Sequence, residues 1–337
     1  MCQTACPVLI NTGDLVKRLR REDQSSVAAA AWTQAAKHWG VVAGGGSLAL
    51  TAAAAVPGAL APAVGAVNRL GRRVVGTDQL PLWSSELPSG GASRRRPAVT
   101  AEPDAVYLPA CVNTMFGPTE GDGVQVSFEK LCARAGLTLL VPAGIDGLCC
   151  GTPWSSKGLP DGYAAMRAKV LPLIYAATRD GDLPVVVDAS SCTEGFFKML
   201  ASDADGPAVR VVDAVQFVAE RVLPLLGSYE RLESVSVHPT CSSTQLGLNS
   251  FLGTVAAGVA TEVQVPLDWQ CCAFAGDRGL LHPELTASAT AAEAAEVEAY
   301  GASAHASCNR TCELEMTRAT GKPYRHILEL LVEVAEV

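Results

Sequence analysis

The chain contains an internal repeat, and this repeat constrains the fold more than any other feature of the sequence. The motif P-x-C-x-x-T-x-x-G occurs within residues 106–117 and again within residues 235–247. Each copy is followed by a proline, an adjacent pair of cysteines, a basic residue next to glycine, and at least one late cysteine. Chance does not reproduce this order of features twice. We therefore expect two homologous units, over residues 101–228 and 229–337.

Short apolar runs alternate with helical patterns in both units. The runs A-V-Y-L-P, P-V-V-V-D and V-S-V-H-P are typical of buried strands, and patterns such as S-F-E-K-L-C-A-R-A-G separate them. This alternation predicts an α/β fold with parallel strands. Residues 1–76 are expected to be mostly helical, with helices over 12–73. Residues 77–100 are rich in Pro, Gly and Ser, and we expect a linker there.

The 337-residue chain has 12 cysteines, and their arrangement argues against a disulfide framework. No secretory signal is visible in the first residues, and a chain of this length does not need covalent cross-links. Adjacent cysteines such as Cys149 and Cys150 also make poor disulfide partners for one another. In cytosolic proteins, clustered cysteines bind metal or do redox work. We therefore expect a cytoplasmic metal or redox protein.

Each repeated unit offers a cysteine after its first strand, an adjacent pair and a late cysteine. Loops at one edge of a parallel sheet converge, so we expect about four thiolates to meet there. Such a set suits an iron–sulfur cluster or zinc, and an adjacent pair suits a multi-iron cluster better. A dithiol–disulfide relay at the adjacent pairs is an alternative. The predicted ligands are Cys111, Cys149, Cys150 and Cys192 in the first unit, and Cys241, Cys271, Cys272 and either Cys308 or Cys312 in the second.

Other features point to more ordinary roles. Cys132 has no counterpart in the second unit, and we expect it to be a packing residue. We expect His238 and His282, which lie near the second cysteine set in sequence, to be structural, although an imidazole there could also ligate metal or carry protons. The basic run at residues 94–96 is expected to be a solvated patch.

The overall charge and one apolar segment bear on partners. A net charge of −8 argues against non-specific nucleic-acid binding. Residues 48–67 carry no charge, but they are mostly Ala and Gly and are interrupted by Pro57 and Pro62. We expect at most peripheral contact with the inner face of a membrane.

The repeated C…C-C-G…C pattern resembles the CCG cysteine-rich domain of heterodisulfide reductase, of glycolate oxidase iron–sulfur subunits and of lactate-utilisation proteins. The stretches Y-L-P-A-C-V-N-T-M-F-G, G-L-C-C-G-T-P-W-S-S-K-G, D-A-S-S-C-T-E-G and N-R-T-C-E-L resemble the C-terminal part of bacterial FAD-linked D-lactate or D-2-hydroxyacid dehydrogenases. The fullest CCG pattern ends in C-x-x-C. Here Ala189 stands three residues before Cys192, and Asn309 three residues before Cys312. An ordinary 4Fe-4S cluster, zinc and an empty site all remain open.

The resemblance also gives a meaning to the first residues. Cys2-x3-Cys6 followed by Pro7 matches the end of the bacterial ferredoxin run C-x2-C-x2-C-x3-C-P. Residues 1–76 would then be a helical remnant of a 4Fe-4S ferredoxin-like domain, with Cys2 and Cys6 as ligands of two different clusters. The other ferredoxin cysteines and an FAD domain would lie upstream of Met1. The resemblance thus implies a C-terminal fragment.

Two classes of function follow from these expectations. The first is an electron-transfer module that passes electrons from an FAD-binding dehydrogenase domain or subunit towards a quinone or cytochrome acceptor. No G-x-G-x-x-G follows a predicted strand, and no flavin site is visible, so we expect no catalytic residues for oxidation of a 2-hydroxyacid on this chain itself. The alternative is a zinc-bound or metal-free interaction domain that docks a partner flavoprotein.

Overall fold

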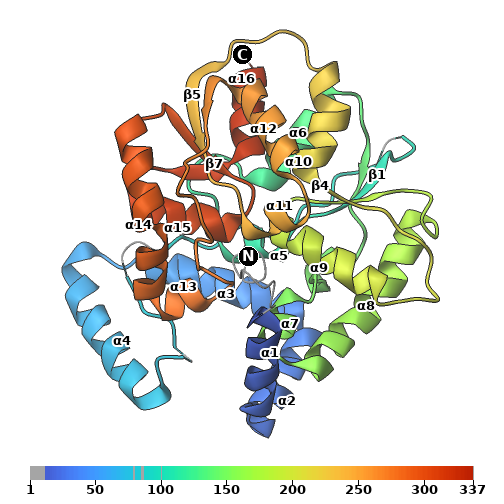
Figure 1. The fold of residues 1–337 in the computed structure, drawn as a ribbon. Helices are drawn as coiled ribbons and strands as arrows, with labels where there is room; N and C mark the ends of the chain where they lie inside the picture. Colours follow the sequence, from blue (N-terminus) through green and yellow to red (C-terminus); the bar gives the residue numbers. More distant parts are fainter. Residues whose placement is uncertain (1–11, 79, 85–86, 100, 337) are drawn as a thin grey trace. The chain divides into compact units, whose positions relative to one another are not determined.

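The structure is a computed structural model that describes residues 12–78, 80–84, 87–99 and 101–336 (Figure 1). Cys2 and Cys6, the predicted ferredoxin ligands, lie outside the described residues. Tertiary contacts divide the chain into two compact units, each discontinuous in sequence. The sheet-A unit comprises Met1–Ala43, Arg94–Cys111 and Leu137–Ala214, and the sheet-B unit comprises Gly44–Ser93, Val112–Gly136 and Val215–Val337. The domain limits that the sequence suggested stay a prediction.

Each unit is built on one four-stranded parallel sheet. Sheet A has the strand order β2-β1-β3-β4, and sheet B has the order β6-β5-β7-β8. The two sheets therefore have the same topology, and the predicted α/β fold with parallel strands is confirmed. The strands are β1 (Ala105–Leu108), β2 (Leu139–Leu140), β3 (Val185–Val187), β4 (Val211–Asp213), β5 (Leu232–Val237), β6 (Ala260–Gln264), β7 (Ala304–Ser307) and β8 (Tyr324–His326).

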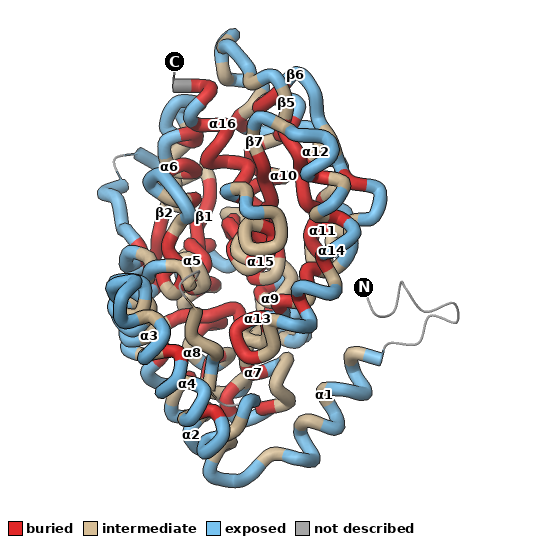
Figure 2. Tube along the Cα trace, turned by 90° about the vertical axis from the view of Figure 1, so that its left-hand side faces the viewer, coloured by how far each residue is buried: buried red, intermediate tan, exposed pale blue. Residues whose placement is uncertain are grey.

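Both central strands of sheet A are buried, and in sheet B burial covers most of β7 and the second half of β5. Strands β1 and β3 are buried at every position, and β7 is buried along most of its length (Figure 2). A parallel sheet with helices on both faces has no solvated side, so its strands are near-continuous apolar runs. The Val-Val-Val sequence of β3 meets this requirement with β-branched side chains, which pack well on a pleated surface.

The helices before and between the strands agree with the expected helical segments. Residues 12–75 are mainly helical, as predicted. Among the described residues of 77–99 there is no helix or strand. The α-helices are α1 (Thr12–Glu22), α2 (Ser26–Lys37), α3 (Trp39–Ala54), α4 (Ala61–Val75), α5 (Cys111–Met115), α6 (Val124–Arg134), α7 (Thr152–Lys157), α8 (Pro160–Thr178), α9 (Ser190–Ala201), α10 (Ala214–Phe217), α11 (Cys241–Gln245), α12 (Asn249–Val259), α13 (Arg278–Leu281), α14 (Pro283–Tyr300), α15 (Arg310–Thr320) and α16 (Ile327–Glu336). Short helical turns are η1 (Gly58–Leu60), η2 (Ile145–Gly147), η3 (Val218–Val222) and η4 (Leu223–Leu225).

The order of strands in sheet B determines where its helices pack. The connection from β5 to β6 runs to one side of β5, and the chain then returns past β5 to β7 and β8. Right-handed crossovers place α12 on one face and α14 and α15 on the other. In agreement, α12 packs with α16, which in turn packs with α6, while α14 packs with α15.

The apolar segment before the linker does not form one long helix. No individual helix in the described part of the chain is long and apolar enough to cross a membrane; α3 and the η1–α4 segment meet that criterion only as a pair, with a 91° bend between them.

A tryptophan cluster ties the first helices to the rest of the sheet-A unit. The Trp154 ring meets Trp39 and Trp32 edge-on, with ring centroids 4.8 and 6.4 Å apart, and its Nε1 donates to the carbonyl of Trp32 at 2.8 Å. Gly162 of α8 permits this packing, because a Cβ there would collide with the ring of Trp154.

We predict that Gly162→Ala lowers the free energy of unfolding by about 1–3 kcal/mol, because the added methyl displaces a fully buried ring. Gly44→Ala is the matched control, since a Cβ at this helical glycine meets no atom within 4 Å. It should raise stability by about 0.5–1 kcal/mol. Urea unfolding measures both, and equal effects of the two substitutions would contradict the packing argument.

Candidate metal centres

The first thiol set comprises Cys111, Cys149, Cys150 and Cys192 and lies at the carboxyl edge of sheet A. Cys111 begins α5, three residues after the end of β1. The adjacent pair follows η2, in the connection after β2, and Cys192 is the third residue of α9, which follows β3. All four side chains are buried, and the ten cysteines that the structure describes are free thiols. The loops therefore converge as predicted.

Within this set each thiol interacts with the next, from Cys111 to Cys149, Cys150 and Cys192. The Sγ atoms of Cys111 and Cys149 lie 3.6 Å apart, and Cys150 interacts with Cys192 and lies 3.2 Å from Oγ1 of Thr152. A hydrogen bond with Cys149 lowers the pKa of Cys111, and hydrogen bonds with Cys149 and then Cys192 lower that of Cys150, whereas the pKa values of Cys149 and Cys192 are raised. Half of the set is thus favoured as thiolate, the form that binds metal.

A buried arginine lies beside this set. The guanidinium of Arg94 donates to the carbonyls of Pro109 and Leu148 at 3.2 and 3.1 Å, and its charge lowers the pKa of Cys111 after the larger effect of the hydrogen bond with Cys149. The interpretation of residues 94–96 as a solvated patch is therefore wrong for Arg94. Of the three arginines in this run, Arg94 is buried, and Arg95 and Arg96 are exposed.

Asp188 is also buried close to these thiols. It accepts hydrogen bonds from the hydroxyl of Tyr107 at 2.6 Å and from the backbone N–H of Ala110 at 2.7 Å. Burial raises the pKa of Asp188 to about 6, although these hydrogen bonds and the charge of Arg94 act to lower it. The carboxylate holds the loop before Cys111 against the end of β3.

The second thiol set has the same arrangement at the carboxyl edge of sheet B. Cys241 begins α11 after β5, Cys271 and Cys272 lie in the loop after β6, and Cys312 is the third residue of α15 after β7. Cys272 and Cys312 are buried, whereas Cys241 and Cys271 are partly exposed. The second set is therefore less buried than the first on the side of Cys241 and Cys271.

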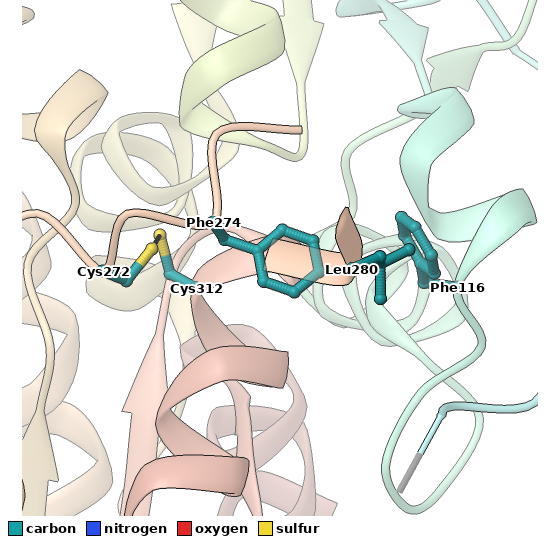
Figure 3. Close-up of a cluster of buried hydrophobic side chains, with 5 residues drawn as sticks. All are labelled: Phe116, Cys272, Phe274, Leu280 and Cys312. Atoms are coloured by element: carbon teal, nitrogen blue, oxygen red, sulfur yellow. Dashed lines mark hydrogen bonds between the residues drawn. The ribbon is translucent and has the colours of Figure 1, made fainter. Parts of the chain in front are cut away.

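The second set contains two hydrogen-bonded pairs of thiols. The Sγ atoms of Cys272 and Cys312 point toward one another at 3.1 Å (Figure 3), and Cys241 shares a hydrogen bond with Cys271. Hydrogen bonds from the partner thiols lower the pKa of Cys271 to about 7 and that of Cys272 to about 5, the latter with help from His238. In both units the first cysteine contacts the first of the adjacent two, and the second of the two contacts the late cysteine; in the first set the adjacent cysteines also hydrogen-bond to each other.

An apolar cluster covers Cys272 and Cys312. Phe274 follows the adjacent pair, and its ring packs edge-on against Phe116, with centroids 6.3 Å apart (Figure 3). Leu280 completes the buried cluster. These side chains exclude water from one side of the thiol pair.

Strand register shows which residues of the two units are equivalent. Val106 of β1 pairs with Val185 of β3, and Ser236 of β5 pairs with His305 of β7. Val106 lies five residues before Cys111, and Ser236 lies five residues before Cys241. Aligning Val106 with Ser236 and Val185 with His305 therefore matches the strand pairs of the two sheets and also aligns Cys111 with Cys241.

The same alignment resolves the ambiguity at the late cysteines. Counting on from the paired strands makes Cys312 equivalent to Cys192, and both are the third residue of their helices. Cys308 is equivalent to Asp188 instead. Its Sγ lies 3.9 Å from Oγ1 of Thr240.

His238 lies beside the second thiol set. It is fully buried after β5, and its Nδ1 lies 2.7 Å from Oε1 of Glu293. One ring nitrogen of His238 and the Sγ atoms of Cys272 and Cys312 all lie within 4.8 Å of one another. The imidazole therefore belongs to the second set, and its position after β5, three residues before Cys241, was the available signal.

Other residues weighed from the sequence lie elsewhere. His282 interacts with Asp78 at 2.6 Å and with Glu284 at 3.1 Å. Lys157, which recurs with Arg278 after the adjacent pairs, lies over the ring of Trp32. Cys132 is fully buried within α6.

Comparison with known families bears on the second set. Residues 235–317 match the CCG family, described as a cysteine-rich domain. The matched range extends from β5 into α15 and contains all five cysteines of this region. No curated protein matches the chain.

The sets have the donor chemistry of metal sites. Two thiolates on one tetrahedral zinc ion lie about 3.8 Å apart, given a Zn–S distance of about 2.3 Å. The 3.6 Å between Cys111 and Cys149 is close to this value. Clustered free thiols, which in the second set lie within the range that matches the cysteine-rich CCG family, point to metal or iron–sulfur binding.

We predict that Arg94→Met lowers the free energy of unfolding by about 2–4 kcal/mol, because two buried charge-assisted hydrogen bonds are lost and Asp188 loses a compensating charge. Arg96→Met is the matched control and should change stability by less than about 0.5 kcal/mol. Urea unfolding of both variants tests this. If both variants lowered the free energy of unfolding by similar amounts, Arg94 would not stabilise the fold around the first thiol set.

Proposed function

We propose that this chain is an iron–sulfur electron-transfer module with one redox centre in each unit. The observation that carries the proposal is the repetition of four thiols at matching positions, with two thiol contacts in common, at the carboxyl edges of two sheets of identical topology. Packing alone does not require the same residue type at matching positions twice. The CCG match over residues 235–317 supports a metal-binding role for the second copy.

The residues around the thiols suit a buried charged centre. In the sheet-A unit, Arg94 supplies a buried positive charge beside Cys111, which offsets part of the charge of several thiolates. In the sheet-B unit, Phe274 and Phe116 exclude water from one side of Cys272 and Cys312. A bound iron–sulfur cluster would accept and release single electrons, with a potential set by burial and hydrogen bonds.

We further propose that the electrons come from an FAD-linked 2-hydroxyacid dehydrogenase of the D-lactate or glycolate type. The support is the resemblance of the cysteine motifs to the C-terminal part of those enzymes. The FAD-binding domain or subunit would be the donor, and a quinone or cytochrome the acceptor, in a cytoplasmic protein with at most peripheral membrane contact.

The first test is cluster content. After anaerobic reconstitution with iron and sulfide we expect a brown protein with a 4Fe-4S electron paramagnetic resonance signal. Cys149→Ser and Cys271→Ser should each remove one centre and about half of the iron, because each removes a ligand from one set. Cys132→Ala, outside both sets, should retain all of it. A protein that stays colourless and binds no iron would refute the proposal.

The second test separates the late cysteines. Cys312→Ser should abolish the second centre, because Cys312 occupies the position of Cys192 and contacts Cys272. Cys308→Ala should leave the metal content unchanged, because its counterpart in the other unit is an aspartate. Iron and sulfide analysis of the two variants measures this, and the reverse result would show that the register does not identify the ligand.

Zinc is the second candidate, and a specific observation favours it. The close approach of the paired thiols is nearer to the spacing on one metal ion than to that of thiolates on separate irons of a cluster. In that case the chain would be a zinc-stabilised domain that docks a flavoprotein. Zinc without iron or labile sulfide in the purified protein would establish this alternative.

A further inference from the structure

The two thiol sets are not chemically identical. The alignment that makes Cys111 equivalent to Cys241 also makes Leu108, the last residue of β1, equivalent to His238. The first set therefore has an aliphatic side chain where the second has an imidazole. Leu108 and His238 occupy the same backbone position, because each directly precedes the proline before the first cysteine of its set.

His238 is held in one orientation. Its backbone N–H donates to the carbonyl of Ala306 at 2.8 Å, and its own carbonyl accepts from the hydroxyl of Ser307 at 2.9 Å. On the ring, Nδ1 is 2.7 Å from the buried carboxylate of Glu293 on α14. A hydrogen bond to a carboxylate fixes the tautomer of a histidine and leaves the other ring nitrogen available.

The imidazole of His238 lies beside the thiols. Nε2 of His238 is buried and has no nitrogen or oxygen partner among the residues that the structure describes, and besides Glu293 the ring interacts with the thiol of Cys272. Buried polar side chains are satisfied in most cases by oxygen or nitrogen groups, because sulfur is a weak hydrogen-bonding partner. Instead, this imidazole lies with the Sγ atoms of Cys272 and Cys312 within 4.8 Å of one another. Nitrogen and sulfur donors in this combination are those of zinc and iron sites.

We propose that His238 is a metal ligand, through Nε2, in a mixed imidazole–thiolate centre with Cys272 and Cys312, and that Glu293 positions its ring. The sheet-A unit then holds an all-thiolate centre and the sheet-B unit a nitrogen-containing one. This rests on the proposed function only in that the second set binds a metal.

The difference has a consequence for electron transfer. An imidazole donor carries no negative charge, so a centre that includes one is easier to reduce than an all-thiolate centre. The second centre is therefore expected to have the higher reduction potential of the two. Electrons entering the chain would settle on the sheet-B unit.

The experiment uses the full chain with Cys149→Ser and Cys150→Ser, so that only the second set is loaded. The protein is produced with ¹⁵N-histidine, reconstituted with iron and sulfide, reduced and measured by pulsed electron paramagnetic resonance. A strong coupling that changes from the ¹⁴N to the ¹⁵N pattern is the expected result. If the set takes zinc instead, X-ray absorption should show a nitrogen donor together with sulfur.

Three further variants assign the nitrogen. His238→Leu places there the residue found at the equivalent position of the sheet-A unit, and it should abolish the nitrogen signal. His305→Leu is the matched control, because His305 is also buried in the sheet-B unit but packs against Tyr324. It should keep the signal. Glu293→Gln should keep the nitrogen ligand but weaken metal affinity by about 10–100-fold.

The outcomes separate this inference from the proposed function. Metal bound without a histidine nitrogen, or a nitrogen signal that survives His238→Leu, overturns the role of His238 and leaves the metal centre standing. A second set that binds neither iron nor zinc overturns both. Fast alkylation of Cys272 in such metal-free protein, lost in His238→Leu, would identify an imidazolium–thiolate pair instead.

Discussion

The convergence of loops at the carboxyl edge of a parallel sheet is the constraint on which both candidate centres depend. In sheet B, connections leave β5 to one side and β7 to the other, so the ends of these two strands flank a switch point in the strand order. Cys241 and Cys312 follow those two strands directly. The adjacent pair arrives from the neighbouring strand. The strand order therefore suffices to bring these cysteines, which are distant in sequence, to one edge of the sheet.

Several thiolates buried in one place carry negative charge that a nearby cationic group must offset. The two units use different groups for this. In the sheet-A unit the compensating group is Arg94, a cation held by backbone carbonyls. In the sheet-B unit it is His238, held by Glu293. The repeat therefore preserves the donor sulfurs and the topology, whereas the surrounding charges have diverged. That divergence is the physical basis for expecting two centres of unequal potential.

Much of this organisation was predictable from the sequence. The repeated cysteines, the α/β alternation and the helical segment over residues 12–73 all rest on local patterns, and the structure confirms the fold class. The role of Arg94 was not predictable, because R-R-R between polar residues has the composition of a solvated run. Only the packing of the linker shows that its first arginine turns inward. The equivalence of Cys308 with Asp188 likewise required the register of β1–β3 and β5–β7.

The sequence by itself determined that the chain has two related α/β units and which cysteines recur, because strand and helix periodicity and ligand type are local properties. The tertiary structure decided which thiols contact one another, that Cys312 rather than Cys308 stands in the place of Cys192, and that the imidazole of His238 lies beside Cys272 and Cys312. These are contacts between residues about 30 to 75 positions apart. Their geometry depends on strand order and register, which bring distant segments to one edge and which no local pattern encodes.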